Sequence, residues 1–546
     1  MKKWFLLFIL SILLNSISLF SQKFERTVLP AEFTAPWEIQ YGPDHHLWLT
    51  DRNGVIARVD TFGNKTIIYQ APDFFWGSEY EYLQSPCQKF VISGTLGLAL
   101  DPKFMEDGHS FLYYIYSYNA GTDSMPKTMN KIVQIHWNKE TETATFVRDL
   151  YVEIPSGMDH IGGRMIAVVE NDTSYLYFTV GDCGVSEFSK PECFPDQSLN
   201  PDNFTQDPTK KNGKTHRINI NGDIPWSNPI PGNSMFTRGH RNPQGMFYIP
   251  ETNTVYTTEH GDFTDDEINP LYDGMNYGFK NVHGYHHDDN FTGEADFIAN
   301  YKPHPLILND SLVEPIYSWC AVPKPENTKD NSTWCTVAPS DAIYYADTTI
   351  QSLHNTILVT TLKTSELVTS GLYVFHLNDD KKTLRPSTEK QPNPRRLFVE
   401  DNPLNGRLRD IAVNPEGTKI YLITNNFNGE PNRIIVYSYV GESDTTDNSD
   451  TTDTNPDDST ETSVWEKNMS SLEVFLSPNP VNDYLNISTR FEVKSLEIYS
   501  VLGEKVLEFS EKNSKYDVRN LSRGMYTILL RGKGMNQIVY AKFLKE

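Results

Sequence analysis

Short apolar strands alternate with polar turns along most of this chain, in a unit that returns six times. Each unit has an apolar run, a turn containing Pro, Asp, Asn or Gly, and an aromatic strand that ends in polar residues. The units begin at Trp37, Leu98, Arg164, Gly245, Ala342 and Asp410. Six irregularly spaced strand–turn–strand units predict an all-β fold, a six-bladed β-propeller with loops of variable length. A sandwich of about twelve or more strands is the alternative, and the fixed phase of the unit favours the propeller.

The pattern changes after residue 440. Residues 441–463 carry eight acidic side chains, no basic ones and almost no apolar ones. Such a composition cannot bury a core, so it predicts a disordered, self-repelling linker. Residues 464–546 return to short alternating strands, around Leu472, Ser495 and Met525, and predict a small β-sandwich.

The amino-terminal segment, residues 1–21, combines Lys2 and Lys3, an apolar run and small polar residues. This is the pattern of a secretory signal peptide, and the apolar run is short for a membrane span. No later segment has the length of a transmembrane helix. We therefore expect an exported protein whose propeller occupies residues 22–440.

Composition and charge narrow the possible partners. The 29 Tyr and 29 Phe, with 33 Pro and 32 Gly, favour many short strands over long helices. The net charge of −23 argues against nucleic acid or an anionic membrane surface as a partner. An acidic surface that keeps an exported protein soluble explains the charge without any specific partner.

Five cysteines lie at positions 87, 183, 193, 320 and 335, and disulfides are expected in an exported protein. The simplest pairing joins Cys183 to Cys193 and Cys320 to Cys335, which leaves Cys87 as a free thiol. A zinc site is the alternative, but the spacings match no CxxC pattern.

The phase of the repeat gathers charged residues at one end of the propeller. In a hairpin, residues before the first strand and after the second lie at the same end. Those before first strands include Asp159, His160, Arg241, Asn242, Thr336, Arg407 and Arg409, and those after second strands include Asp182, Cys183, His260 and Lys363. Cations gathered in so acidic a protein predict a bound polyanionic small molecule, because Arg and Lys bind carboxylates by charge-assisted hydrogen bonds. Taken singly, each residue has a simpler interpretation as a solvated loop charge or a turn residue.

The tail carries three strings in order: SPNPVND from Ser477, IYSVLG from Ile498 and LSRGMY from Leu521. Together they resemble the type A C-terminal sorting domain of type IX secretion. The resemblance implies that the type IX secretion machinery exports the protein to the cell surface or the medium. A carbohydrate-binding module is the alternative, and the tail lacks the cluster of exposed Trp expected of one.

The propeller region carries an ordered set of motifs: DH at Asp159, GHRNPQG at Gly239, EHG at Glu259, TVAPS at Thr336 and RLRD at Arg407. This set resembles the soluble quinoprotein glucose dehydrogenases and the related aldose sugar dehydrogenases, which use pyrroloquinoline quinone (PQQ). A lone RNPQG string would be a weak signal, whereas the ordered set spread along the propeller region is a strong one.

The resemblance implies a role for each matching residue. His160 matches the general base, and Asp159 its neighbour in the sugar pocket. Arg241 and Asn242 match residues at the reactive carbonyl of the quinone. Three cations match those that hold the PQQ carboxylates, with a threonine and a histidine beside them: Lys363, Arg407, Arg409, Thr336 and His260. The backbone carbonyls of Gly261 and Asp262 match the ligands of a Ca²⁺ that bridges to the cofactor, and oxygen ligands suit this hard cation.

Several positions depart from the glucose enzymes. Ile92 and Cys183 stand where those enzymes have sugar-contacting glutamines, and His260 replaces a glutamine, as in the aldose enzymes. Asp262 replaces a proline, which a carbonyl ligand does not need. His287 stands where an Asp ligand of a second calcium ion is expected. Glucose specificity and a second calcium site are therefore not supported.

These observations predict a secreted PQQ- and Ca²⁺-dependent dehydrogenase that oxidises an aldose sugar at C1 to the lactone. The electrons would pass to an external acceptor. A Ca²⁺-dependent propeller lactonase is the first alternative, because a fold does not fix a function; the excess of cations in the channel disfavours it. A non-catalytic carbohydrate-binding propeller is the second, and His160, Arg241 and Lys363 disfavour it.

Overall fold

A computed structural model of the chain describes residues 24–441 and 474–545, apart from internal gaps. The gaps are 52, 76–93, 123–126, 157–159, 184–203, 289, 328–333, 364–369, 389–390, 402–404, 427–428, 478–480, 490–492, 501–504, 510–514 and 533–537. The chain divides into two compact units, Met1–Asp444 and Thr445–Glu546. The predicted signal peptide, and the predicted linker beyond Gly441, lie outside the described residues.

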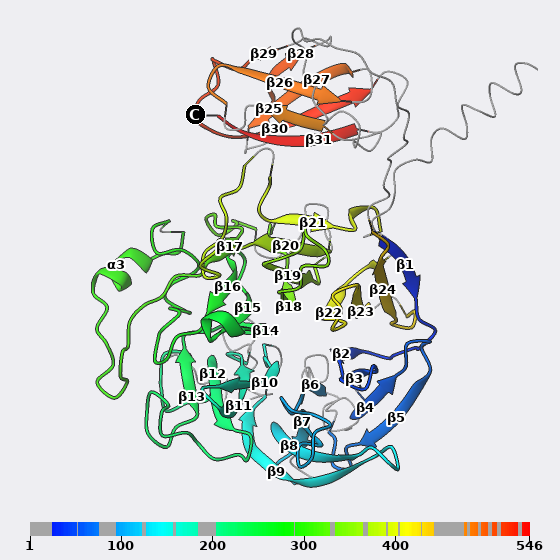
Figure 1. Cartoon of the computed structure of the whole chain (residues 1–546). Helices are drawn as coiled ribbons and strands as arrows, with labels where there is room; N and C mark the ends of the chain where they lie inside the picture. The colour runs from blue at the N-terminus through cyan, green and yellow to red at the C-terminus, as the bar shows by residue number, and fades with distance from the viewer. Residues whose placement is uncertain are drawn as a thin grey trace, which may run out of the picture. The chain divides into compact units, whose positions relative to one another are not determined.

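Six four-stranded sheets surround a common axis in the first unit (Figure 1). The first sheet comprises β2 (Pro36–Tyr41), β3 (Leu47–Asp51), β4 (Val55–Val59) and β5 (Lys65–Gln70). The second comprises β6 (Thr95–Leu100), β7 (Phe111–Asn119), β8 (Thr128–Asn138) and β9 (Thr143–Pro155). The third comprises β10 (Met165–Glu170), β11 (Thr173–Val180), β12 (Lys214–Asn219) and β13 (Met235–Arg238).

The remaining three sheets repeat this plan. The fourth comprises β14 (Asn242–Ile249), β15 (Thr254–His260), β16 (Asp266–Pro270) and β17 (Tyr317–Trp319), with helix α3 (Glu294–Ala299) between the last two strands. The fifth comprises β18 (Pro339–Tyr345), β19 (Thr356–Thr361), β20 (Leu372–His376) and β21 (Arg395–Leu397). The sixth comprises β22 (Leu408–Val413), β23 (Lys419–Thr424), β24 (Ile434–Tyr439) and β1 (Phe24–Val28). The predicted six-bladed propeller is confirmed, and each repeat unit forms the inner hairpin of one blade.

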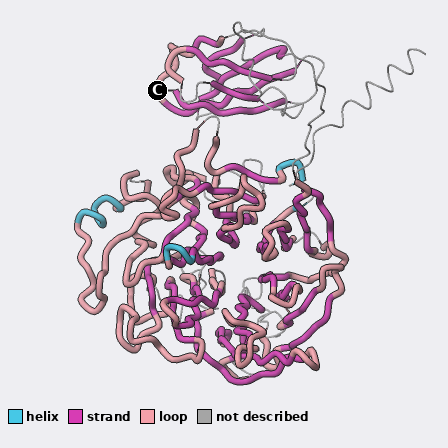
Figure 2. Tube along the Cα trace, in the orientation of Figure 1, coloured by secondary structure: helices cyan, strands magenta, loops and turns pink. Residues whose placement is uncertain are grey.

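The blades close into a ring. The innermost strands pack against one another in the order β2, β6, β10, β14, β18, β22 and back to β2. The amino-terminal strand β1 pairs antiparallel with β24, from Phe24 opposite Tyr439 to Val28 opposite Ile435. The first strand of the fold therefore supplies the outer strand of the last blade. Figure 2 shows that strands form the blades and that helix is confined to a few short segments.

The inner strands of each blade lie between two neighbouring sheets, so both of their faces are buried. All six residues of β19 and all five of β3 are buried, whereas most of the outer strand β5 is exposed. Neighbouring blades share apolar cores, such as the one that packs Leu49 and Val59 against Ile423. This packing fixes where each inner strand begins and ends, and therefore where its flanking residues lie.

A buried ionic cluster ties four blades together at the axis. Arg164, just before β10, lies 2.7 Å from Glu38 of β2 and 2.8 Å from Asp410 of β22. It also lies 3.4 Å from Asp341 of β18. Breaking a buried ion pair by removing one partner costs about 3–5 kcal/mol. Burial raises the pKa of Glu38 to about 8, with Asp410 adding to this and Arg164 opposing it.

The second unit contains two small sheets with one core between them. One sheet comprises β25 (Val474–Ser477), β26 (Tyr484–Thr489) and β29 (Tyr516–Asp517), and the other β28 (Lys505–Phe509), β27 (Val493–Ser500), β30 (Gly524–Gly532) and β31 (Ile538–Lys545). Leu485, Leu496 and Ile528 are among its fully buried residues. The predicted small β-sandwich is confirmed. In neither unit is any described helix long and apolar enough to span a membrane.

Of the two predicted disulfides, one is confirmed and one is wrong. Cys320 and Cys335 form a disulfide, as predicted. The predicted Cys183–Cys193 disulfide is wrong, because Cys183 is a free, buried thiol. It lies three residues beyond the end of β11, and its Sγ donates to the Gly181 carbonyl at 3.7 Å, so local chain packing holds it. Burial raises the pKa of this thiol. Cys193 and Cys87 lie outside the described residues.

Candidate active site

One hairpin presents three of the predicted site residues together. Asn242 begins β14 and pairs directly with His260, the last residue of β15. Arg241 precedes Asn242, and its NH1 donates to the His260 carbonyl at 3.3 Å. A single carboxylate organises the turn, because Glu259 accepts hydrogen bonds from the backbone N–H groups of both Arg241 and Asn242. Arg241, Asn242 and His260 therefore share one end of the fourth blade.

His160 pairs with the carboxylate of Asp182, and both residues belong to the third blade, next to this hairpin. Its Nδ1 lies 2.8 Å from Oδ1 of Asp182, and the two residues are only 7% and 3% exposed. A carboxylate accepts the Nδ1 proton, so Nε2 keeps the lone pair that a general base needs. The Asp182 N–H donates to the Arg241 carbonyl at 2.7 Å, which ties this pair to the hairpin. Asp159, the predicted neighbour of His160, lies outside the described residues.

His160 also has an unusual backbone conformation. Its φ is +48°, in the left-handed region that residues other than glycine seldom adopt. Such conformations cost about 1–3 kcal/mol and cluster at functional sites. Gly181, across the turn, leaves no room for a side chain, since an added Cβ would lie 1.9 Å from the His160 carbonyl oxygen. The chain thus fixes the His160 backbone closely against the start of the Asp182 loop.

The pKa of His260 indicates a positive electrostatic potential at this end of the channel. Burial lowers the pKa of His260 well below 6.5, and Arg241, Arg409, His160 and Arg407 lower it further. Its Nε2 is buried and has no hydrogen-bond partner among the described residues. Residues from the third, fourth and sixth blades therefore act on one imidazole, which stays neutral in their positive field.

Lys363 and Arg407 are held by neutral oxygen atoms. Lys363 Nζ donates to the Trp334 carbonyl at 2.5 Å and to Oγ1 of Thr336 at 3.1 Å. Arg407 donates to the carbonyls of Asn425 and Leu362, each at 3.0 Å. Burial lowers the pKa of both groups. Ligand carboxylates beside these cations would offset their desolvation, which suits a polyanionic ligand.

Arg409 lies between an aromatic ring and an amide. Its guanidinium stacks over Trp37, 4.2 Å from the ring centroid, and its NH1 donates to Oε1 of Gln244 at 3.0 Å. Neither Trp37 nor Gln244 is among the predicted site residues. The sequence gives a signal for Trp37, because it opens the first repeat unit and therefore lies near the start of an inner strand.

The Gly261–Asp262 turn is fixed by an acid below it. Oδ1 of Asp266 accepts from the Gly261 N–H at 3.0 Å, and Oδ2 accepts from the N–H groups of Val337 and Ala338 at 2.6 and 2.8 Å. Burial raises the pKa of Asp266 to about 6. An added Cβ at Gly261 would meet the Thr264 carbonyl at 1.9 Å, so only glycine fits. Asp266 therefore joins the turn to the strand entry that carries Thr336.

A small cavity of about 10 Å³ lies beneath this turn, lined in part by Arg241, Glu259, Asp262 and Glu267. It has room for about one water-sized group, too little for a sugar or a quinone. No group of three or more His, Cys, Asp or Glu side chains in the described parts of the chain is arranged to hold a metal ion. His287, at the predicted second calcium site, is a largely exposed side chain 3.6 Å from Glu314.

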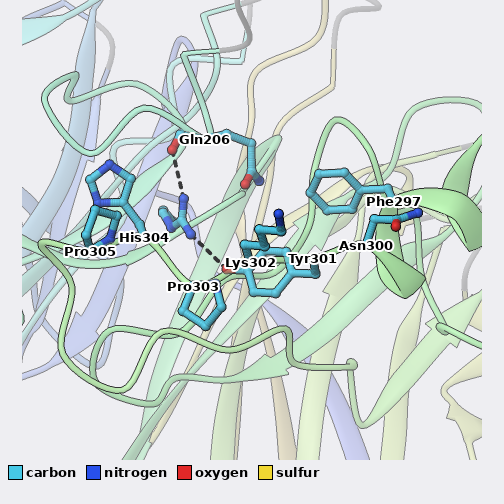
Figure 3. A pocket seen from close by; sticks show the side chains of 9 residues that line it. Gln206, Phe297, Asn300, Tyr301, Lys302, Pro303, His304 and Pro305 are labelled. Carbon is cyan, nitrogen blue, oxygen red and sulfur yellow. Dashed lines mark hydrogen bonds between the residues drawn. The ribbon is translucent and has the colours of Figure 1, made fainter.

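A larger groove of about 530 Å³ lies away from these residues (Figure 3). Phe297, Tyr301, Pro303 and Gln206 are among the residues that line it, and none of the predicted site residues does. Arg238 lines it as well, but its guanidinium is occupied by Asp310 at 2.6 Å. The candidate active site is therefore the end of the channel that carries His160 and His260.

A family model described as Glucose / Sorbosone dehydrogenase matches residues 33–436, most of the chain. The chain belongs to this family. Membership confirms the resemblance of the propeller and places the protein among the oxidoreductases. A second model, described as a Secretion system C-terminal sorting domain, matches residues 476–545. This match confirms the resemblance of the tail and indicates an exported protein, at the cell surface or released.

Two relatives of the chain each cover 74% of it. Quinoprotein glucose dehydrogenase B of Acinetobacter calcoaceticus is 26% identical over 447 residues, which cover 74% of this chain and 86% of that protein. The aldose sugar dehydrogenase of Escherichia coli K12 is 22% identical over 418 residues, which cover 74% and 90%.

Two solved structures of aldose sugar dehydrogenases share the fold. The PQQ-bound enzyme of Streptomyces coelicolor matches with a TM-score of 0.52 and 22% identity, over 76% of this chain and 98% of its own. The soluble enzyme of Escherichia coli, in its apo form, matches with a TM-score of 0.54 and 21% identity, over 76% and 99%. At these identities the likeness establishes the fold alone.

Proposed function

We propose that this protein is an exported, PQQ- and Ca²⁺-dependent dehydrogenase that oxidises an aldose sugar at C1 to the lactone and passes the electrons to an external acceptor. The observation that carries the proposal is the His160–Asp182 pair beside a group of buried cations at one end of the channel. A base and a polyanion-binding group are the two elements that such a dehydrogenase must combine.

The cations fit the proposed cofactor. PQQ carries several carboxylates on a rigid, flat ring, and it supplies the two-electron acceptor for a hydride that leaves the sugar. Lys363, Arg407 and Arg409 would each bind one carboxylate by charge-assisted hydrogen bonds. Thr336 would add a hydroxyl donor, because its oxygen already accepts from Lys363. Support comes from the PQQ-bound state of one solved family structure.

His160 would act on the sugar as the general base. Hydride departs from C1 readily only when the proton of the C1 hydroxyl is removed at the same time, so a base must lie within hydrogen-bond reach. Asp182 accepts from Nδ1 and leaves Nε2 to take that proton. The negative charge of Asp182 then stabilises the imidazolium that forms, and loss of proton and hydride leaves the lactone.

Calcium would be bound by the carbonyl oxygens of Gly261 and Asp262. Carbonyl oxygens are suitable ligands for this hard cation. Asp266 holds the turn from below and its negative charge favours a cation nearby. Arg241 and Asn242, on the adjacent strand, would donate hydrogen bonds to oxygen atoms of the same ligand. The signal peptide over residues 1–21 and the linker over 441–463 complete the proposed route of export.

The test is a dye-reduction assay on purified protein with PQQ, Ca²⁺ and a panel of aldoses. We expect dye reduction with at least one aldose, dependent on both PQQ and Ca²⁺, and a lactone as product. Ca²⁺-dependent hydrolysis of a lactone without dye reduction would instead establish the lactonase. Sugar binding without either reaction would establish the non-catalytic propeller.

A further inference from the structure

Gln244 links two residues of the proposed cofactor site. It lies two residues beyond Asn242 on β14, at the irregularity between Pro243 and Gly245 where the pairing with β15 shifts register. Its Nε2 donates to Oδ1 of Asn242 at 2.9 Å, and its Oε1 accepts from NH1 of Arg409 at 3.0 Å. Gln244 is 5% exposed, so these partners hold its amide in the absence of solvent.

The order of donors along this chain of hydrogen bonds is fixed from one end. A guanidinium can only donate, so the oxygen of the Gln244 amide must face Arg409. The NH₂ group of Gln244 must then face Asn242, and the side-chain oxygen of Asn242 must accept its hydrogen bond. The NH₂ group of Asn242 is the end left over, and it donates to no other group among the described residues. Arg409 thus determines the polarity of a side chain two links away.

Both ends of this chain are anchored. Arg409 stacks over Trp37, and its NH1 also lies 3.3 Å from Oγ of Ser340. The Gln244 carbonyl accepts from Nε of Arg164, at the axial ionic cluster, at 2.9 Å. The Asn242 N–H donates to Glu259 at 3.2 Å. Rotation of either amide would place two donors or two acceptors against each other in a buried site, which is costly.

We infer that Gln244 is a positioning residue that, through Arg409, orients Asn242 so that its NH₂ group is the one offered to a carbonyl oxygen of the bound ligand. The inference rests on the proposed function, in which that ligand is a quinone. A carbonyl oxygen accepts hydrogen bonds, so it requires a donor at this point. An Asn242 turned the other way would present its own oxygen and repel the ligand.

Two substitutions separate this role from simple packing. Gln244→Glu keeps an acceptor for Arg409 but offers only oxygen to Asn242, so it reverses the Asn242 amide. Gln244→Met removes both hydrogen bonds, so the Asn242 amide can adopt either orientation. Positioning predicts that Gln244→Glu weakens PQQ binding about 10- to 100-fold and Gln244→Met by less. A packing role predicts the opposite order, because the glutamate keeps the contact with Arg409.

The chain provides a matched control. Gln206 forms a similar pair with Asn276, with amide hydrogen bonds of 2.9 and 2.7 Å, and it lines the outer groove (Figure 3). Gln206→Glu disturbs a Gln–Asn pair of the same kind whose two residues are not among those proposed to bind the cofactor. We expect it to lower the thermal midpoint without changing PQQ affinity, measured by equilibrium titration of the folded protein.

Two further measurements decide the inference. In an Asn242→Ala background, Gln244→Glu and Gln244→Met should bind PQQ within about twofold of each other. Neutron diffraction from perdeuterated protein without PQQ should place deuterium on the Asn242 atom that points away from Gln244. An oxygen there, or a milder effect of glutamate than of methionine, would overturn the inference. If the wild-type protein binds no PQQ, the proposed function fails, and the neutron result still decides the orientation of Asn242.

Discussion

Replacement of Asp182 tests the proposed base most directly. The Asp182 carboxylate accepts from Nδ1 of His160 at 2.8 Å, and both groups are buried. A hydrogen bond to a charged group is worth about 1.5–3 kcal/mol, which corresponds to a rate change of roughly 10- to 150-fold. Asp182→Ala should lower kcat by this amount, since the imidazole keeps its lone pair for part of the time.

Asp182→Asn should be worse than Asp182→Ala, although it is the more conservative change. Its amide NH₂ would donate to Nδ1 and force the proton onto Nε2, which removes the base in the dominant tautomer. The expected loss in kcat approaches the full contribution of a general base, about 10²–10⁴-fold. PQQ affinity should stay within about threefold of wild type in both variants, because Asp182 is proposed to act on His160 and not on the carboxylates of the cofactor.

The assay is pre-steady-state dye reduction with the best aldose substrate, alongside a PQQ titration of each variant. His160→Ala provides the reference for complete loss of the base. Equal kcat in Asp182→Asn and wild type would refute the reasoning. So would a loss of PQQ affinity that matches the loss in kcat, because Asp182 would then hold the site together rather than orient His160.

Three further results are expected. Arg407→Ala should weaken PQQ binding at least about tenfold, measured by titration, with the fold retained by circular dichroism; unchanged affinity would remove Arg407 from the site. Relative to wild type, Glu38→Gln should be more favourable to stability at pH 8 than at pH 5, because the pKa of Glu38 rises from 4.5 to about 8 on folding. The folded state then binds the extra proton, and wild-type stability falls as pH increases through this window. Denaturant unfolding at pH 5 and pH 8 tests this, and equal differences at both would contradict it. Deletion of residues 464–546 should leave an active propeller in the periplasm, and export of the truncated protein across the outer membrane would argue against a sorting role.

The sequence predicts the inner hairpins of the blades better than their outer strands. Strands such as β3 and β19 are buried on both faces and carry the apolar, aromatic runs that form the repeat unit. Outer strands such as β5 are largely exposed and show no such pattern. The partner of β1 could not be predicted for another reason. The strand β24 lies more than 400 residues away, and no local sequence pattern indicates pairing between strands so far apart.

Partner choice inside the candidate site was harder to predict than residue placement. The phase of the repeat brings Arg241 and His260 to one end because strand ends are a matter of local register. Asp182 is the partner of His160 although Asp159 is its neighbour in sequence, since the contact is made across a turn between two strands. Cys183 remains a free thiol for the same reason: spacing along the chain does not show which side chains are enclosed.

The pairing of β1 with β24 closes the ring of blades. The strand β1 comes from the start of the propeller sequence and β24 from its end, so the last blade is complete only after Tyr439 has paired with Phe24. Closing so long a chain segment costs entropy that only the finished blade repays. Peptides copying residues 24–28 should therefore compete for β24 in a chain shortened by that strand. Residues 24–28 therefore determine whether the exposed sheet edges of an unclosed ring pair with each other or with another molecule.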